Sequence, residues 1–382
     1  MINVALIGST GSIGRQVCNV VRRYPDLFRL SALVANTNGK LLFEQAAEFQ
    51  PKRAILLKSE LLAGMPPSIG VTALQTGEQN ALDCIDEADV VFVAATGFAG
   101  LKYSLRAIES RKKLALANKE TLVCGGELVM RKVKEYGIDL IPVDSEHSAL
   151  WQALHFNRHG EYEKLLLTAS GGPFYGYTKE QLEKVTVKDA LKHPTWSMGA
   201  KITIDSATLL NKGFEVIEAK WLYDAPFDKI EAVVQPESII HSMVQFSDGA
   251  VLAQMSYPTM ELPIQLALTY PKRLDCGLKR MDFAALGNIR FLPLRRKDFP
   301  CFDLALSAGE AGMGYPCALN AAGEEGVRAF LQERIKFTQI AEVMEQTLQN
   351  CPFAGERADD YQALRALDLR ARQEAQRIID KW

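Results

Sequence analysis

Short apolar segments alternate with amphipathic segments over the first third of the chain. The runs INVALIG, RLSALVA, AILL, ADVVFVAAT and KLALAN predict buried strands, and Ser12 to Arg23, LLFEQAAEFQ and LKYSLRAIES predict helices. Such alternation is typical of a doubly wound parallel sheet. We therefore expect residues 1–143 to form an α/β domain built on such a sheet.

The pattern changes in the middle of the chain. LLLTAS predicts a strand, which the glycine-rich GGPFYGY follows. LKHPTWSMGAKITI has little periodicity and predicts a loop that covers a site, whereas SATLLNKGFEVIEAKWL predicts a helix. SIIHSMVQF and AVLAQMSY predict a β-hairpin about a Ser-Asp-Gly turn. We expect an α+β domain over residues 144–270, with a flexible loop at about residues 170–200.

The last part of the chain is helical in pattern. Residues 271–299 carry basic residues and prolines without a clean period, so we expect a linker there. Residues 300–382 predict a C-terminal helical domain. Its last helix has one apolar stripe at i, i+3 and i+4 intervals, formed by Leu364, Leu367, Ala371, Ala375 and Ile378.

Composition narrows the class of protein. The 382 residues are 48% apolar and 24% charged, which is typical of a soluble globular protein. A net charge of -2 gives no basic field for nucleic acid and no polybasic patch for a membrane, and no apolar run could span a bilayer. The N-terminus enters a strand without signal character, so we expect a cytoplasmic protein. The seven cysteines include no CxxC pair, which predicts reduced thiols rather than a cysteine metal site.

A glycine-rich turn follows the first predicted strand. Gly8, Gly11 and Gly14 lie between a strand and a helix, where glycines let the backbone approach a pyrophosphate. An ordinary βα turn is the alternative, but the context favours a Rossmann-like dinucleotide site. The second strand ends at residues 33–38 without an acid, which favours NADP over NAD; Arg15 and Lys40 are the nearest basic residues.

The stretch VDSEHS, residues 143–148, lies where a strand gives way to a helix. Asp144 and Glu146 could simply cap the helix and stabilise its macrodipole. In a parallel sheet, however, the carboxyl ends of strands are where ligands bind. The two carboxylates would then suit a hard cation such as Mg²⁺ or Mn²⁺.

Further polar residues recur in the middle of the chain. A polar stripe of Thr208, Asn211, Lys212, Glu215 and Glu218 is either a third-ligand face or a solvated face with a Lys212–Glu215 pair. In the polar loop, Trp196 is either a core plug or part of a lid, and His193 could bind an anion. Ser170-Gly171-Gly172 could form an anion-binding nest, and Asn118-Lys119-Glu120 ends a predicted strand. His241, in the hairpin, is expected to be a packed histidine.

Taken together, these segments resemble the 1-deoxy-D-xylulose 5-phosphate reductoisomerase family. The matching runs are GSTGSIG (8–14), ANKETLV (117–123), PVDSEHSA (142–149), LTASGGPF (167–174), LKHPTWSMGAKITIDSATLLNKGFEVIEA (191–219) and SIIHSMVQFSDGAVLAQ (238–254). The resemblance implies rearrangement of 1-deoxy-D-xylulose 5-phosphate and its reduction by NADPH to 2-C-methyl-D-erythritol 4-phosphate, in the non-mevalonate isoprenoid route. It also implies a need for Mg²⁺, Mn²⁺ or Co²⁺, and a homodimer.

The resemblance also assigns roles to individual residues. The metal ligands would be Asp144, Glu146 and Glu215. Lys119, Ser145, Glu146 and Glu215 would be the catalytic residues. The substrate would be held by Ser170, His193, Trp196, Ser206, Asn211 and Lys212. The NADPH site would be formed by Thr10, Gly11, Ser12, Ile13, Asn38, Asn118, Glu120 and Gly199.

The chain departs from the family pattern at a few positions. Ala169 replaces an expected glycine, and Gln235-Pro-Glu-Ser replaces the usual His-Pro-Gln-Ser. Asn36-Thr37 lacks the glycine and basic residue of some members, which leaves the contact to the NADPH 2'-phosphate open. Two other functions compete with the reductoisomerase. One is an NADP-dependent semialdehyde-type dehydrogenase that uses Cys124, and the other is a nucleotide-sensing regulator that binds a partner protein.

Overall fold

The computed structural model describes residues 1–59, 66–155, 161–196 and 198–382. The chain divides into two compact units, and each is made of segments that are distant in the sequence. Unit 1 comprises Met1–Asn118, Val129–Ser148 and Thr259–Leu278, and unit 2 comprises Lys119–Leu128, Ala149–Pro258 and Lys279–Trp382. Among the described residues, none of the helices combines the length and apolarity that crossing a membrane requires.

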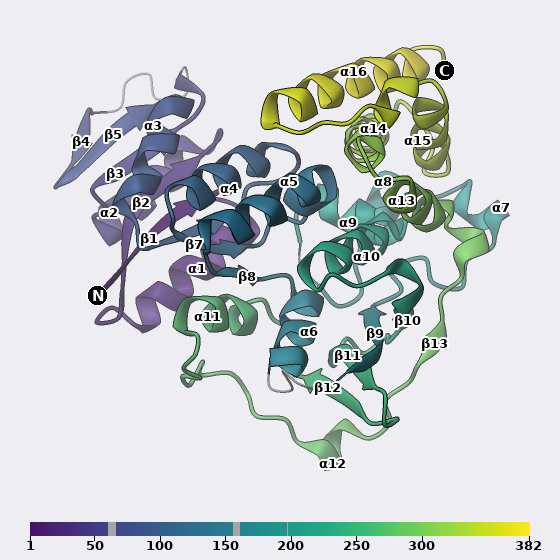
Figure 1. The fold of residues 1–382 in the computed structure, drawn as a ribbon, viewed down its shortest axis with the longest axis horizontal. Helices are drawn as coiled ribbons and strands as arrows, with labels where there is room; N and C mark the ends of the chain where they lie inside the picture. Colours follow the sequence, from purple (N-terminus) through teal and green to yellow (C-terminus); the bar gives the residue numbers. More distant parts are fainter. Residues whose placement is uncertain (60–65, 156–160, 197) are drawn as a thin grey trace. The chain divides into compact units, whose positions relative to one another are not determined.

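Unit 1 is built on an eight-stranded sheet in the order β4-β5-β3-β2-β1-β6-β7-β8 (Figure 1). Every neighbouring pair is parallel except β4 and β5. The order reverses between β1 and β6, so the predicted doubly wound sheet is confirmed. The strands are β1 (Ile2–Ile7), β2 (Phe28–Ala35), β3 (Arg53–Leu56), β4 (Ser68–Ile69), β5 (Thr72–Thr76), β6 (Val90–Val93), β7 (Lys113–Leu116) and β8 (Leu140–Pro142).

Helices connect these strands, and the central strands are buried because apolar side chains cover them. Val4, Leu6, Leu33 and Phe92 are fully buried in the core of unit 1. Helix α11 was not predicted, because ELPIQLALT is short and carries a proline, yet it packs on α1. The helices are α1 (Ser12–Arg23), α2 (Gly39–Phe49), α3 (Glu78–Asp83), α4 (Ala99–Glu109), α5 (Glu120–Tyr136), α6 (Ser145–His155) and α11 (Glu261–Thr269); α5 begins in unit 2, and α6 ends there.

Unit 2 contains a five-stranded mixed sheet in the order β12-β11-β9-β10-β13. The predicted hairpin is confirmed, since β11 and β12 pair antiparallel about the Ser-Asp-Gly turn. Strands β9 and β10 pair in parallel, and β13 adds a short antiparallel edge to β10. The strands are β9 (Tyr162–Ala169), β10 (Ile230–Val234), β11 (Ile240–Phe246), β12 (Val251–Met255) and β13 (Leu292–Pro293).

Two predictions for the middle of the chain were wrong in detail. The segment 191–204 is not all loop, because α9 begins at Ala200. The segment 206–222 is not one helix, because α9 ends at Ala207 and Leu209 has a left-handed φ of 60° before α10. Thr208 Oγ1 hydrogen bonds back to Ile204 O, and this side-chain bond accompanies the break. The helices of this segment are α7 (Lys179–Leu182), α8 (Val187–Ala190), α9 (Ala200–Ala207) and α10 (Leu210–Leu222).

The C-terminal region is helical, as predicted. Helix α14 packs against both α15 and α16, and α10 packs against α13 (Figure 1). The apolar stripe predicted from Leu364 to Ile378 is buried. Residues 271–299 are mostly irregular and supply β13 and the short helix Phe283–Leu286. The helices are α12 (Phe283–Leu286), α13 (Pro300–Ala311), α14 (Tyr315–Leu331), α15 (Gln339–Gln349) and α16 (Tyr361–Ile379).

Candidate active site

The glycine-rich turn of unit 1 joins the end of β1 to the start of α1. Gly8 has a φ of 91°, and a Cβ there would lie 2.5 Å from Ala94 O. A Cβ on Gly14 would lie 2.3 Å from Gly8 O, so α1 can approach the turn only because residue 14 is a glycine. Gly11 caps α1 without a side chain, which leaves the helix N-terminus open to an anion. The turn therefore fits the pyrophosphate of a dinucleotide.

Two asparagines predicted to bind the cofactor have defined structural contacts. The Asn38 side chain caps α2 by accepting a hydrogen bond of 3.1 Å from Leu41 N. Asn118 is buried at the end of β7, and its Nδ2 donates to Gly97 O at 3.1 Å. Arg15 and Lys40, the basic residues considered for the 2'-phosphate, are both exposed. These positions all belong to unit 1, as do Thr10, Ser12 and Ile13.

The stretch that carries Asp144 follows β8 and opens α6. Ser148 N donates to Asp144 O at 2.7 Å, so Asp144 immediately precedes the helix. Ser145 Oγ donates to Glu146 Oε2 at 2.6 Å. Asp144 and Glu146 therefore lie where a helix cap would lie and also at the carboxyl edge of the sheet, so both interpretations of the sequence agree with this geometry.

Glu215 on α10 is the centre of a buried polar cluster in unit 2. Its side chain is 0% exposed, and Lys119 Nζ lies 3.3 Å from Oε1. Asn211 Nδ2 donates to the same oxygen at 2.6 Å, and Lys212 pairs with Oε2. The polar stripe is therefore not a solvated face, because Lys212 and Glu215 are both buried. Burying a charge is costly unless it is paired, and these two lysines meet that condition for Glu215.

Residues predicted to hold the substrate phosphate are also brought together in unit 2. Ser170 Oγ lies 3.1 Å from His193 Nε2. A Cβ on Gly172 would lie 3.0 Å from Ser206 O, so the turn after Ser170 packs closely on α9. Lys212 Nζ donates to Thr168 O, on the strand that leads to Ser170. Hydroxyls, an imidazole and an ammonium thus gather around one turn, as an anion site requires.

The hydrogen bonds of His193 define its tautomer. Nδ1 accepts from the backbone amides of Thr195, at 3.1 Å, and Trp196, at 2.9 Å. The neutral ring therefore carries its proton on Nε2, which faces Ser170 Oγ. Burial lowers the pKa of His193 below its ordinary value. A neutral His193 can still donate one hydrogen bond to an anion through Nε2.

Trp196 lies in the loop that precedes α9. Its ring meets the ring of His241 edge to face, with centroids 6.3 Å apart. His241 is buried, and its Nε2 lies 2.9 Å from Ser256 Oγ, so it is the packed histidine that we expected. Residue 197 of this loop lies outside the described residues. Gly199 caps α9, and no heavy atom of the described residues outside its own chain neighbours and helix backbone lies within 4 Å of a Cβ built there.

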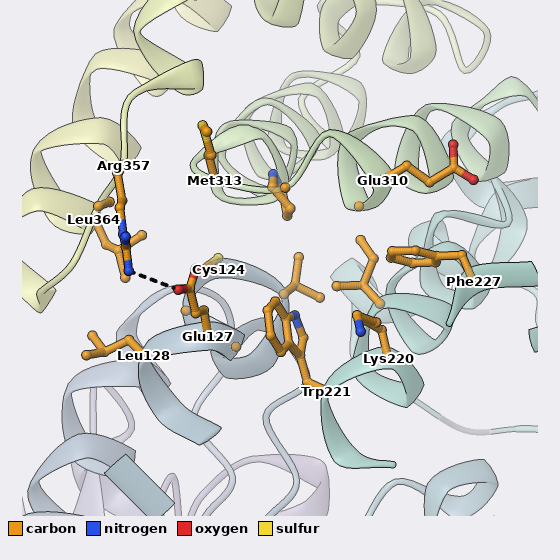
Figure 2. A pocket seen from close by; sticks show the side chains of 18 of the residues that line it. Cys124, Glu127, Leu128, Lys220, Trp221, Phe227, Glu310, Met313, Arg357 and Leu364 are labelled. Carbon is orange, nitrogen blue, oxygen red and sulfur yellow. Dashed lines mark hydrogen bonds and ion pairs between the residues drawn. The ribbon is translucent and has the colours of Figure 1, made fainter. Parts of the chain in front are cut away.

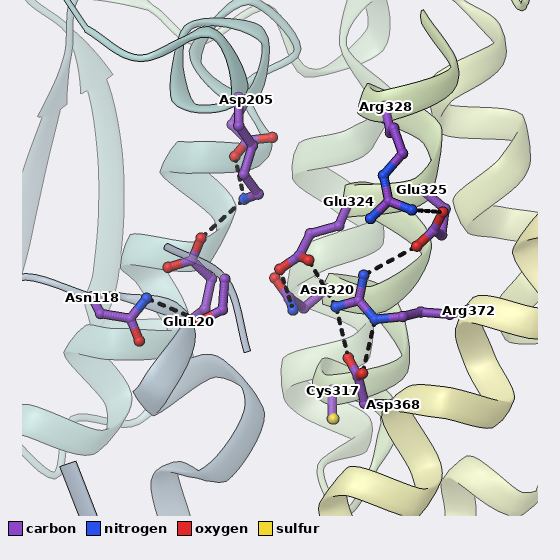
Figure 3. Close-up of polar contacts among 12 residues, drawn as sticks. Asn118, Glu120, Asp205, Cys317, Asn320, Glu324, Glu325, Arg328, Asp368 and Arg372 are labelled. Carbon is purple, nitrogen blue, oxygen red and sulfur yellow. Dashed lines mark hydrogen bonds and ion pairs between the residues drawn. The ribbon is translucent and has the colours of Figure 1, made fainter. Parts of the chain in front are cut away.

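The sequence did not single out Lys201 and Asp205, which lie beside a predicted cofactor residue. Lys201 Nζ is 3.0 Å from Glu120 Oε1 and 2.7 Å from Asp205 Oδ2 (Figure 3). The only local signal was the i, i+4 spacing of Lys201 and Asp205. The contact to Glu120 joins residues that are 81 positions apart, so spacing could not reveal it.

A cavity of about 430 Å³ occupies another part of unit 2 (Figure 2). Its wall includes the kinked segment of α5 at Cys124, the rings of Trp221 and Phe227, and Arg357, which pairs with Glu127 at 3.4 Å. The predicted site residues do not line it. Burial raises the pKa of the Cys124 thiol well above its ordinary value. Such a thiol is a poor nucleophile, which argues against the dehydrogenase alternative.

Gln235, which replaces the usual histidine, has a structural contact. Its side chain is buried, and Oε1 accepts from the amides of Ile239, at 2.7 Å, and Ile240, at 3.2 Å. The substitution therefore stabilises the entry to β11. Ala169 ends β9 in extended conformation and accepts a hydrogen bond from Gln235 N at 2.7 Å.

The side chains of Asp144, Glu146 and Glu215 each offer a carboxylate oxygen to a metal ion. Hard divalent cations such as Mg²⁺ and Mn²⁺ prefer oxygen ligands of this kind. The chemistry of the donor set therefore fits the metal that the sequence predicted.

Comparison with known proteins matches nearly the whole chain. Family models described as 1-deoxy-D-xylulose 5-phosphate reductoisomerase match residues 4–126, and those of its C-terminal domains match residues 140–223 and 255–374. The 1-deoxy-D-xylulose 5-phosphate reductoisomerase of Pelotomaculum thermopropionicum is 48% identical over 93% of this chain and 93% of its own.

Solved structures of the same family have the same fold. A crystal structure of DOX-P reductoisomerase in complex with NADPH, fosmidomycin and magnesium superposes with a TM-score of 0.94 at 35% identity, over 100% of this chain and 98% of its own. The enzyme from Zymomonas mobilis in complex with NADPH gives a TM-score of 0.90 at 37% identity, over 100% of both chains. The chain described here belongs to the 1-deoxy-D-xylulose 5-phosphate reductoisomerase family.

Proposed function

We propose that this protein converts 1-deoxy-D-xylulose 5-phosphate to 2-C-methyl-D-erythritol 4-phosphate, with NADPH and a divalent metal ion, in isoprenoid biosynthesis. Family membership supports the reaction. The observation that carries it in this chain is the buried Glu215, which contacts Lys119, Asn211 and Lys212. A generic nucleotide-binding protein has no need of a carboxylate buried among two lysines.

The metal site would be formed by three carboxylates. Asp144, Glu146 and Glu215 would bind one Mg²⁺, Mn²⁺ or Co²⁺ ion. When bound, the ion supplies a Lewis acid that polarises the substrate's ketone and neighbouring hydroxyl oxygen. Ser145 would hydrogen bond to the substrate. Lys119 would contact the substrate near the metal, and its charge would also balance that of Glu215.

The substrate phosphate would bind in unit 2. Lys212, which is buried, would supply a positive charge, and Ser170, Ser206 and Asn211 would supply hydrogen-bond donors. His193 would donate from Nε2, the nitrogen that already faces Ser170. Binding energy from this remote group could close the loop at about residues 170–200. Trp196 would then cover the carbon chain and exclude water.

NADPH would bind at the glycine-rich turn and supply the hydride for the reduction. Thr10, Gly11, Ser12 and Ile13 would contact it from the turn, where the absence of a side chain at residue 11 leaves the helix N-terminus open. The remaining contacts would come from Asn38, Asn118, Glu120 and Gly199. The exposed Arg15 and Lys40 are the candidates for the 2'-phosphate.

We also propose a function for each segment of the chain. Residues 1–143 would bind NADPH, and residues 144–270 would bind the metal and the substrate. Residues 271–299 would link them to the helical domain at 300–382. We further propose that the protein is cytoplasmic and forms a homodimer. Light scattering of the purified protein would test the dimer by measuring its mass.

Product analysis tests the proposed function. The protein should convert 1-deoxy-D-xylulose 5-phosphate into the branched tetritol phosphate, identified by NMR, only when NADPH and Mn²⁺ are both present. EDTA should stop the reaction, and added Mn²⁺ should restore it. Consumption of NADPH without the branched product would contradict the proposal.

A further inference from the structure

Lys201 connects the first turns of two helices of unit 2. It is the second residue of α9, directly after Gly199 and Ala200. Its Nζ lies 3.0 Å from Oε1 of Glu120, the first residue of α5, and 2.7 Å from Asp205 Oδ2. The three side chains are 25%, 9% and 4% exposed, so solvent screens these pairs poorly. Hydrogen bonds between such charged groups are shorter and about twice as strong as those between neutral groups.

The position of Glu120 depends on this ammonium. Burial alone would raise the pKa of Glu120, but the charge and hydrogen bond of Lys201 hold the pKa below its ordinary value. Lys119 adds a smaller positive contribution. Glu120 therefore remains a charged acceptor. Without Lys201, its carboxyl group would either take up a proton or turn towards another donor.

A second buried cluster supports Lys201 from the C-terminal helices. Glu324 on α14 adds to the negative field that raises the pKa of Lys201. Glu324 itself is held by Asn320, at 3.1 Å, and by Arg372 on α16, at 2.7 Å (Figure 3). Arg372 also donates hydrogen bonds to both carboxylate oxygens of Asp368, at 2.8 and 2.9 Å. The helices α14 and α16 thus hold an acid whose charge stabilises the Lys201 ammonium.

We propose that Lys201 is a positioning residue for the cofactor and substrate site, because it ties the Lys119-Glu120 turn of α5 to the start of α9. This inference rests on the proposed roles of Glu120 and Gly199 in binding NADPH. A shift at the start of α9 is transmitted to Glu120 through one hydrogen bond of 3.0 Å. Lys201 contacts neither ligand itself and acts through Glu120.

The test is a double-mutant cycle on NADPH affinity, measured by cofactor fluorescence without sugar phosphate. The variants are Lys201→Met, Glu120→Gln and the double variant. Lys201→Met should weaken NADPH binding by about 10- to 100-fold, the range for a lost charge-assisted hydrogen bond. The double variant should bind about as well as Glu120→Gln alone, because Lys201 acts through Glu120. Lys201→Arg should restore most of the affinity.

Lys164→Met is the matched control. Lys164 pairs with Glu231 at 3.0 Å, the distance between Lys201 and Glu120, but its side chain is 42% exposed. This variant should leave NADPH affinity unchanged. If Lys201→Met does not unfold cooperatively, Lys201→Gln, which keeps a donor without the charge, takes its place in the cycle.

A pH profile separates positioning from a purely structural role. The charged groups that act on Glu120 include Lys119, Lys201 and Asp205, and Glu324 acts on Lys201 and Asp205. In Lys201→Met the pKa of Glu120 should rise, so NADPH affinity should fall as the pH is lowered from 8 to 5 more steeply than in the wild type. Lys201→Met with wild-type affinity, or a double variant whose losses add, would overturn the inference. Wild-type protein that does not bind NADPH would overturn both the inference and the proposed function. Wild-type protein that binds NADPH but makes no product would overturn the proposed function alone.

Discussion

Replacing Gly14 by alanine tests the geometry of the glycine-rich turn. The added Cβ would lie 2.3 Å from Gly8 O and 2.5 Å from Ser9 O, and both are backbone atoms. The turn cannot yield easily, because Gly8 N and Ser9 N both donate to Val34 O, at 2.8 and 2.9 Å. Helix α1 would therefore have to move by about 1 Å to reach normal contact distance.

The magnitude follows from two opposing effects. Overpacking against fixed atoms costs about 3 kcal/mol, whereas alanine gains about 1 kcal/mol in helix propensity over glycine. A net loss of about 2 kcal/mol should lower Tm by about 4–8 °C in a domain of this size. Displacing the amides of α1 should also weaken NADPH binding by about tenfold or more.

Differential scanning fluorimetry and NADPH titration measure the two effects. Gly11→Ala is the control for stability, because a Cβ there would lie 3.4 Å from Gly8 O, an ordinary contact. It should lower Tm by less than Gly14→Ala does, because replacing an N-cap glycine by alanine costs only about 1 kcal/mol or less. Gly14→Ala with an unchanged or higher Tm and unchanged NADPH affinity would refute the reasoning.

Three further predictions concern other parts of the chain. Burial lowers the pKa of His193 below its unfolded value of about 6.5. The stability that the neutral ring contributes is therefore present above pH 6.5 and should be lost as the pH falls through the folded pKa. NMR should find the Nε2–H tautomer, and a His193 pKa above about 6.5 would contradict the prediction. All seven cysteines are buried, so iodoacetamide should label the native protein far more slowly than the unfolded protein, which mass spectrometry can measure. Rapid alkylation of Cys124 with loss of activity would instead favour a catalytic thiol. Gly126→Ala would place a Cβ 2.2 Å from Trp221 Cδ1. The variant should therefore be destabilised by about 1–3 kcal/mol, and its tryptophan fluorescence should change. An unchanged denaturation midpoint would show that the indole can move aside at no cost.

The elements that the sequence predicted well are those whose signal is local. The helix at Ser12–Arg23 matches its structure residue for residue, because the glycine turn marks its start and apolar residues mark one face. The hairpin of β11 and β12 follows from alternation and a turn. The apolar stripe of α16 needs only its own period. In each case the information lies within one segment.

The misses arise where tertiary contacts decide. β13 has only two residues and exists because β10 offers it an edge. The sequence did not predict the start of α9, because KITI carries two isoleucines and a threonine, which are β-branched and favour strands. The break at Leu209 has a left-handed backbone that sequence does not predict for leucine.

For the candidate site, too, the sequence predicted the features with a local signal and not those that depend on tertiary contacts. Spacing placed Asn211, Lys212 and Glu215 on one helix, yet it left open whether they face solvent or a ligand. Burial decides this, and burial depends on the sheet and the C-terminal helices that enclose α10. The partnership of Lys201 with Glu120 joins distant segments and became visible only in the structure.

The most direct test of the account is the decay of NADPH absorbance with 1-deoxy-D-xylulose 5-phosphate, with and without Mn²⁺. It should be measured for the wild type, for Glu215→Gln, and for Glu231→Gln as a surface control, since Glu231 is 56% exposed. The account predicts rapid decay that requires the metal, is abolished in Glu215→Gln and is unchanged in Glu231→Gln. No decay with any divalent metal, despite tight NADPH binding by the wild type, would contradict it.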